Sequence, residues 1–188
     1  MLLALKEEIL AKVISVSKRE GHHFSKSVVR SITLIQGEGV EDDGHRGKTV
    51  QHRSRVKADP TQPNLRQVHL IHAELFDELH EQGFDIEPAA LGENITTCGI
   101  DLLSLPKGSL LQFPSGAEVS ITGLRNPCPQ IENYKKGLLS AVLSRDESGQ
   151  VVRKAGIMGI VTVGGQVNAG DDIEVVFPHE PFEALERV

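Results

Sequence analysis

Short apolar runs separated by turn residues dominate the alternation of hydrophobic and polar positions along the chain. Seven runs are rich in Val, Ile and Leu over the length of a strand: 13–16, 28–35, 67–71, 109–113, 118–122, 159–163 and 172–177. Pro-Ser-Gly at 114–116 and Asn-Ala-Gly at 168–170 are short connections of the kind that antiparallel strands require. The pattern predicts a mainly β fold, either a barrel or a sandwich.

Two other segments have the spacing of amphipathic helices. Residues 72–82 end before a glycine and place three apolar side chains on one face: Leu75, Phe76 and Leu79. Residues 131–143 also follow a helical period, but Gly137 weakens the middle by about 1 kcal/mol relative to Ala, so two short helices are an alternative. Residues 45–57 have no clear apolar period and form a basic patch with Arg46, Lys48, Arg53, Arg55 and Lys57.

The length and charge of the chain exclude several classes of protein. A chain of 188 residues buries roughly 70% of its unfolded surface, so we predict a single domain over residues 1–188. The formal charge of −6, from 20 Lys and Arg against 26 Asp and Glu, opposes nonspecific binding to nucleic acid. The N-terminal stretch is too short and too charged for a signal peptide, and five glycines interrupt the uncharged run 155–170. We therefore expect a cytoplasmic protein with no nucleic-acid or membrane partner.

The two cysteines lie 30 positions apart without a Cys-x-x-Cys motif, so we expect free thiols. Cys128 stands between Pro127 and Pro129, which stiffen the loop, and Arg125 would stabilise its thiolate, the form that attacks sulfur or binds metal. Taken alone, the residues also allow Cys128 to be a small buried apolar side chain. Cys98 follows an apolar stretch without a nearby cation, and we assign it to packing.

Two polar loop segments are candidate ligand sites. Glu93 and Asn94 follow a glycine at a predicted loop-to-strand junction, where they either bind a polar ligand or cap a turn. In the segment 43–47 the glycines allow close backbone approach, and His45 and Arg46 offer donors to an anion, although a solvated turn is the alternative.

The histidines near the first predicted helix do not make a zinc site. His69 and His72 could face the same way, with His80 further along, but no third ligand has the spacing that zinc enzymes need. Phosphate-loop, dinucleotide-binding, Gly-x-Ser-x-Gly and His-Glu-x-x-His motifs are also absent from the sequence.

Six ordered motifs together resemble the MOSC domain, the family named after the C-terminal part of molybdenum cofactor sulfurases. They are DGH at 43–45, RQVHLI at 66–71, LGENIT at 91–96, GIDL at 99–102, TGLRNPC at 122–128 and GQVNAGD at 165–171. The resemblance covers about residues 28–177. Asp42 and Ala89 depart from it, because the family commonly has glycine at these two places.

The resemblance implies a MOSC-type β-barrel with a few short peripheral helices. It also implies a module that carries sulfur or binds the molybdenum cofactor (molybdopterin), in which Cys128 accepts a persulfide or ligates molybdenum. Arg125 and the basic segment would hold the anionic pterin phosphate. Further residues match the family motifs and are expected in the pocket: Asn126, Glu93, Asn94, His45 and Arg66.

Three functions remain open at this point. A sulfur carrier would need a cysteine desulfurase or another sulfur donor as partner. A molybdenum-pterin reductase of N-hydroxylated compounds would need an electron-transfer partner, since the chain has no flavin, haem or iron-sulfur motif. In a non-catalytic anion-binding barrel, Cys128 would be structural.

Overall fold

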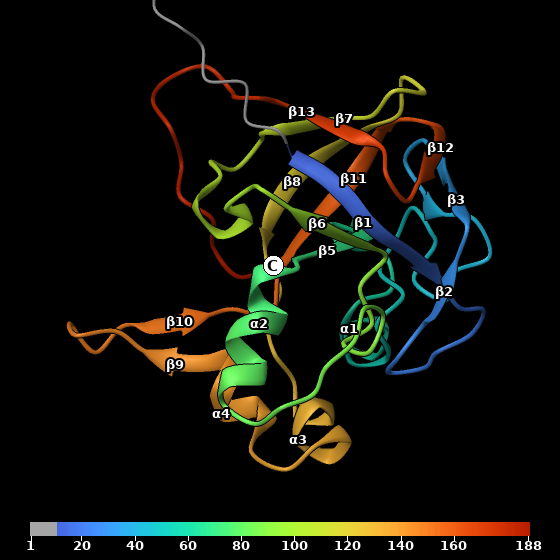
Figure 1. Cartoon of the computed structure of the whole chain (residues 1–188). Coiled ribbons are helices and arrows are strands. Elements are labelled where there is room, and N and C mark those ends of the chain that lie inside the picture. Colours follow the sequence, from blue (N-terminus) through green and yellow to red (C-terminus); the bar gives the residue numbers. More distant parts are fainter. Residues whose placement is uncertain (1–10) are drawn as a thin grey trace, which may run out of the picture.

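A closed β-barrel forms the centre of the computed structural model, which describes residues 11–188 (Figure 1). Seven strands make the barrel, and pairing of the first strand with the last closes it. In order around the barrel they are β13 (Asp172–Val176), β7 (Leu110–Gln112), β8 (Glu118–Leu124), β11 (Ile157–Val163), β5 (Val68–His72), β6 (Ile95–Cys98) and β1 (Ala11–Lys18). Only β5 and β6 pair in parallel within this ring. The prediction of a mainly β barrel is confirmed.

The remaining strands lie outside the ring. The predicted strand 28–35 is interrupted at Arg30, giving β2 (Ser27–Val29), which pairs with β1, and β3 (Ser31–Ile35). Strand β3 joins β4 (Gly39–Val40) and β12 (Gly165–Asn168) in a small sheet. A separate hairpin consists of β9 (Leu143–Arg145) and β10 (Val151–Arg153).

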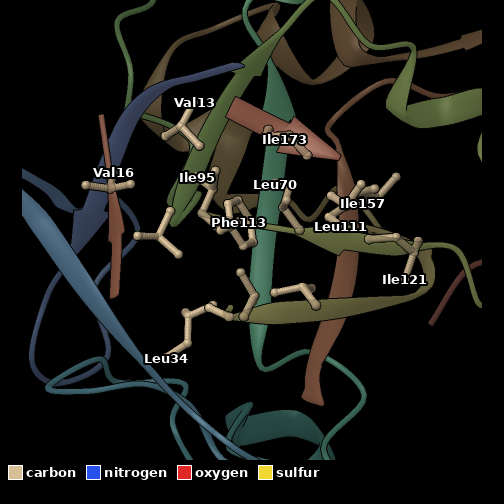
Figure 2. Close-up of a cluster of buried hydrophobic side chains, with 14 of the residues drawn as sticks. Val13, Val16, Leu34, Leu70, Ile95, Leu111, Phe113, Ile121, Ile157 and Ile173 are labelled. Atoms are coloured by element: carbon tan, nitrogen blue, oxygen red, sulfur yellow. The ribbon is translucent and has the colours of Figure 1, made fainter. Parts of the chain in front are cut away.

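Apolar and polar residues alternate along the strands, and the apolar side chains fill the inside of the barrel. On β8, Val119 and Ile121 are buried while their neighbours are partly exposed, and Ile157 and Val161 do the same on β11. Figure 2 shows Ile121 and Ile157 among the labelled side chains of the other strands inside the barrel. Each such side chain contributes about 1.5–3 kcal/mol on full burial, so the barrel is a rigid frame for the loops around it.

A second apolar cluster packs the helices beside the barrel. Helix α2 (Glu74–Glu81) forms where predicted and buries Leu75, Phe76 and Leu79. The other helical segment is two short helices, α3 (Gln130–Tyr134) and α4 (Leu138–Val142), because Gly137 takes a positive φ of 87° between them. In Figure 1 these three helices lie together on one side of the barrel.

The predicted apolar runs do not cover the short strands β4, β9, β10 and β12, and two helical elements were not predicted either. A short 3₁₀ turn, η1 (Leu102–Ser104), follows β6, and helix α1 (Arg53–Ala58) forms within the basic patch. Helix α1 has no apolar period to predict it, because its described side chains are exposed or only half-buried. No helix within residues 11–188 is long and apolar enough to cross a bilayer.

Asp42 and Ala89 are the two non-glycine residues with positive φ in the described part of the chain, at 58° and 74°. These are the two places where the family commonly has glycine. The left-handed region costs an L-residue about 1–2 kcal/mol, less for Asp. Glycine, which the resemblance would place at both positions, adopts this conformation without that cost.

Candidate functional site

A pocket beside the barrel collects residues from six separate parts of the sequence. Its volume is about 90 Å³. Because a water molecule needs on the order of 10–15 Å³ of such space, the pocket has room for a ligand group of several heavy atoms. Six of the seven predicted site residues line it: His45, Arg66, Asn94, Arg125, Asn126 and Cys128.

Cys128 lies half-buried between the end of β8 and the start of α3. Pro127 is buried, Pro129 precedes the first residue of α3, and the Cys128 carbonyl accepts a hydrogen bond from Ile131 N at 3.0 Å. The thiol is 3.6 Å from the side-chain oxygen of Gln130. The two prolines and this first helical turn fix the direction of the thiol, which borders the pocket.

Arg125 brings a guanidinium with one unsatisfied donor atom to the same pocket. Its backbone N–H donates to Gly156 O at 3.0 Å, which fixes the start of the loop. Its Nη1 is buried and has no hydrogen-bond partner in the described part of the chain. Burial lowers the pKa of Arg125, and the charges of Cys128 and Glu93 oppose that effect. A buried donor without a partner is costly, so this guanidinium is suited to an anionic ligand.

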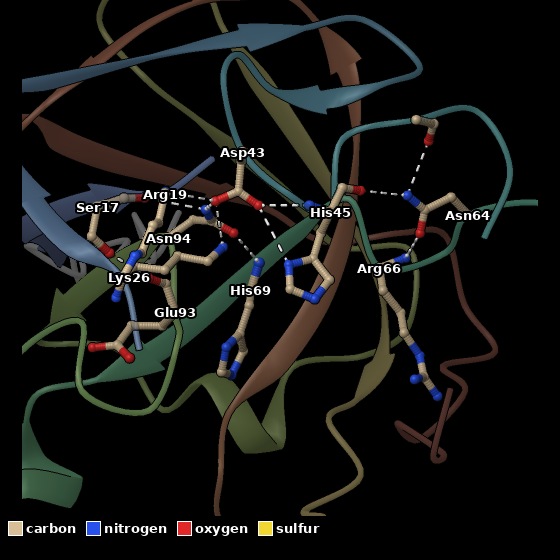
Figure 3. A network of polar contacts seen from close by, with 11 residues as sticks. Ser17, Arg19, Lys26, Asp43, His45, Asn64, Arg66, His69, Glu93 and Asn94 are labelled. Carbon is tan, nitrogen blue, oxygen red and sulfur yellow. Dashed lines mark hydrogen bonds and ion pairs between the residues drawn. The ribbon is translucent and has the colours of Figure 1, made fainter. Parts of the chain in front are cut away.

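Asp43 is the centre of a buried network behind the pocket (Figure 3). Its carboxylate pairs with Lys26 Nζ at 2.8 Å, and both side chains are nearly inaccessible, at 1% and 3% exposure. The carboxylate also accepts from His45 N at 3.0 Å and lies 3.4 Å from His45 Nδ1. Burial would raise the pKa of Asp43, but His45 and Lys26 outweigh it and hold the pKa well below its ordinary value. Asp43 is therefore buried, whereas residues 44–47 form a turn that is half-buried or exposed.

Asn94 and His69 connect this network to the barrel. The Asn94 amide donates to Asp43 Oδ2 and to Ser17 O, each at 3.1 Å, and accepts from His69 N at 3.2 Å. The His69 ring is buried and bonds Ala155 O through Nε2 at 2.8 Å. Burial and then the charge of Arg125 lower the pKa of His69 well below its ordinary value, so its ring is neutral. Both residues hold the pocket wall in place.

Gly44 lets the loop that carries His45 approach the loop between β1 and β2. A Cβ on Gly44 would lie 1.9 Å from the carbonyl oxygen of Gly21, although its φ is not in the left-handed region. The His45 carbonyl accepts from the Asn64 amide at 2.9 Å. The His45 backbone is therefore held at both ends, and its ring lies beside Asp43, as the dashed line in Figure 3 shows.

The pocket is cationic. Lys26, Arg55, Arg66 and Arg125 line it, and in the described part of the chain no Asp or Glu does. Burial and then the charges of Arg55, Arg125 and Arg187 lower the pKa of Arg66 to about 10. Arg66 is therefore still charged near neutral pH. The pocket concentrates positive charge in a chain whose net charge is −6.

Two of the candidate ligand-binding residues lie outside the pocket. Glu93, expected in the pocket, is fully buried and does not line it. Its carboxylate accepts a hydrogen bond from Ala89 N and another from Thr96 Oγ1, and in Figure 3 it points away from His45. Arg46, suggested as an anion donor, instead bonds the Glu38 carboxylate at 2.8 and 2.9 Å on the surface.

The described residues contain no group of three or more His, Cys, Asp or Glu placed to hold a metal ion. His69 and His72 do not face the same way, because they stand three positions apart on β5, where side chains alternate between faces. His69 lines the pocket and His72 does not.

Several pocket residues have no clear signal in the sequence. Lys26 stands between two serines before a strand, like any surface lysine, and only the fold brings it to Asp43. Histidines 23 and 52 and Arg55 also line the pocket. The basic composition of residues 45–57 indicates a cationic surface, but it does not distinguish Arg55, in the pocket, from Arg46, outside it.

A seven-stranded barrel with a loop thiol beside a cationic pocket defines the class of protein. The MOSC domain family matches the chain over residues 42–174, so the chain belongs to this family. A Bacillus subtilis (strain 168) protein named "Putative metal-sulfur cluster biosynthesis proteins YuaD" is 36% identical over 121 residues. That match spans 60% of this chain and 61% of that protein.

Solved structures agree with this assignment. The crystal structure of the YuaD protein from Bacillus subtilis superposes with a TM-score of 0.73 and 31% identity, over 88% of this chain and 94% of that one. The crystal structure of YiiM from Geobacillus stearothermophilus has a TM-score of 0.63 and 17% identity, over 88% and 75%. The second likeness concerns the fold alone.

Proposed function

We propose that the chain is a sulfur-handling module in which Cys128 accepts sulfur as a persulfide. The observation that carries the proposal is the half-buried Cys128 thiol beside a guanidinium whose Nη1 is buried and has no partner in the described chain. The name of the similar YuaD protein, which refers to metal-sulfur cluster biosynthesis, supports the same kind of role.

The transfer step needs no external oxidant. The Cys128 thiolate attacks the outer sulfur of a donor persulfide, a new S–S bond forms, and the bond between the donor's two sulfurs breaks. The donor's inner sulfur leaves as a thiolate, and the outer sulfur keeps its proton or charge. The fixed loop of Cys128 orients the attacking sulfur, and the cations of the pocket stabilise the anions on either side of the step.

The residues present also fit the molybdenum cofactor that the family implies. Arg125, with its unpaired Nη1, and Arg66 would bind the pterin phosphate, and Cys128 offers the soft thiolate ligand that molybdenum accepts. When bound, that cofactor supplies two-electron redox chemistry. The chain's own contribution is binding and orientation: Asp43 and Asn94 hold the pocket wall in place while the arginines bind charge.

Sulfur acceptance is tested by incubating the protein with a cysteine desulfurase and cysteine that carries radioactive sulfur. The proposal predicts label on the wild type, none on Cys128→Ser, and normal labelling of Cys98→Ser. Cys98 is a matched control, because it is also half-buried and lies opposite Lys12 on β1. Equal labelling of Cys128→Ser and the wild type would overturn the proposal.

The cationic pocket also favours a second candidate function, reduction of N-hydroxylated compounds at a molybdenum-pterin centre fed by a separate electron donor. It is tested by elemental and mass analysis of protein purified from cofactor-producing cells supplied with molybdate. Near-stoichiometric molybdenum and pterin in the wild type, lost in Cys128→Ser, would make Cys128 a metal ligand and place this function first. If the protein holds no metal but still accepts sulfur, the carrier function is the one that remains.

A further inference from the structure

A second hollow of about 190 Å³ adjoins the thiol pocket. The two share Val50, Arg55 and Arg66, so the arginines stand between them. The rest of the second hollow is lined mainly by apolar side chains, those of Pro63, Leu65 and Val188. An apolar cavity of about 150 Å³ accepts a benzene-sized molecule, so this hollow has room for one aromatic or branched side chain.

The wall of this hollow is held by backbone hydrogen bonds. Val50 N donates to Gln62 O and Asn64 N donates to Lys48 O, each at 3.0 Å. The Leu65 carbonyl accepts from Thr122 Oγ1 at 2.6 Å, which ties this segment to β8. The hollow therefore exists before any ligand arrives, and a ligand would lose little affinity to ordering it.

Leu65 is 45% exposed although its backbone is fixed. At the edge of the hollow this exposed side chain stands beside two arginines, so a partner would find an apolar contact and positive charge together. The positive charge continues onto the surface: residues 44–66 contain six Lys and Arg and a single acid, Asp59. The exposed side chains of Lys48 and Lys57 belong to this region. Such a surface is complementary to an acidic partner.

We propose that the second hollow docks the acidic segment of a sulfur-donor protein that delivers the persulfide to Cys128. An apolar side chain of that segment fills the space beside Leu65, and its carboxylates pair with Arg55 and with those N–H groups of Arg66 that do not donate to Val188 O. The donor cysteine then reaches the thiol pocket on the other side of the two arginines. This inference rests on the proposed function, since it names the partner of the same thiol.

The test compares two sulfur donors in a labelled-sulfur transfer assay. One is a cysteine desulfurase loaded with labelled persulfide, and the other is the small molecule glutathione persulfide. The variant is Leu65→Glu, which puts a negative charge where acidic side chains would dock. The matched control is Val163→Glu on β11, because Val163 is also 45% exposed and lines neither hollow.

Leu65→Glu is expected to raise the KM for the desulfurase at least about tenfold, since like charges facing each other at an interface cost more than 1.4 kcal/mol. The rate with glutathione persulfide should stay that of the wild type, as should both rates of Val163→Glu. Thermal unfolding of Leu65→Glu near the wild-type midpoint would show that the variant folds.

Three results would overturn the docking proposal, and each leads to a different conclusion. An unchanged KM for the desulfurase in Leu65→Glu would show that the donor does not dock there. Equal losses with both donors would assign the hollow to a small-molecule site. Failure of the wild type to accept sulfur from either donor would refute the proposed function itself, and the docking proposal with it.

Discussion

Replacing Lys26 with Met tests whether the buried ion pair with Asp43 supports the pocket. The two side chains are 3% and 1% exposed, and Nζ lies 2.8 Å from the carboxylate. Removing one partner of a buried pair leaves the other charge without compensation and costs about 3–5 kcal/mol. A chain of this length loses about 2–4 °C of unfolding temperature per kcal/mol, so Lys26→Met should unfold about 6–20 °C below the wild type.

The assay is urea and thermal unfolding followed by far-ultraviolet circular dichroism, because the chain has no Trp to report by fluorescence. The matched control is Lys12→Met, whose partner Asp172 is exposed on the barrel surface. Exposed pairs contribute little, so this control should unfold like the wild type. The double variant Lys26→Met/Asp43→Asn should be less destabilised than the sum of the two single variants by about 2 kcal/mol.

A Lys26→Met protein that is as stable as Lys12→Met would refute the reasoning. It would mean that Asp43 is satisfied by its other hydrogen bonds, from His45 and Asn94, without the lysine. Strict additivity of the two single variants would contradict it as well, because it would show that Lys26 and Asp43 do not interact.

Three further predictions concern the loops around the site. Gly44→Ala should cost about 3 kcal/mol or more in urea unfolding, because its Cβ would lie 1.9 Å from the Gly21 carbonyl oxygen. Ala89→Gly should raise stability by up to about 1 kcal/mol in the same assay, since relief of a φ of 74° outweighs the entropy that glycine costs. Burial raises the pKa of Asp43, but the hydrogen bonds and charges of His45 and Lys26 together outweigh it and hold the pKa below its ordinary value of 3.8. Its stabilisation is therefore present above that value and lost as pH falls below about 4, so the wild type should lose more stability than Asp43→Asn in an acid titration of unfolding.

The fold was largely predictable because most barrel strands carry their own signal. Alternating apolar residues mark β8 and β11, and the apolar face of α2 marks that helix. The closure of the barrel through β1 and β13 has no local signal, since it depends on pairing between the two ends of the described chain. Helix α1 was not predictable either, because it has no apolar face.

The site was predictable only in part, because motifs and spacing do not report where a side chain points or which distant residue it contacts. The ordered motifs brought Cys128, Arg125 and His45 together by resemblance, and the structure finds them around one pocket. Glu93 was misplaced because a motif does not tell whether a side chain points into a pocket or supports a loop behind it. Lys26 was missed because its role depends on a contact with Asp43, which no spacing in the sequence reports.

The most direct measurement is the mass of the intact protein, with a peptide map, after incubation with a persulfide donor and blocking of free thiols. Wild-type protein should gain the mass of one sulfur atom on the peptide that contains Cys128, and Cys98→Ser should gain the same. A sulfur found only on Cys98, or found equally in Cys128→Ser, would contradict the assignment of Cys128 as the sulfur acceptor.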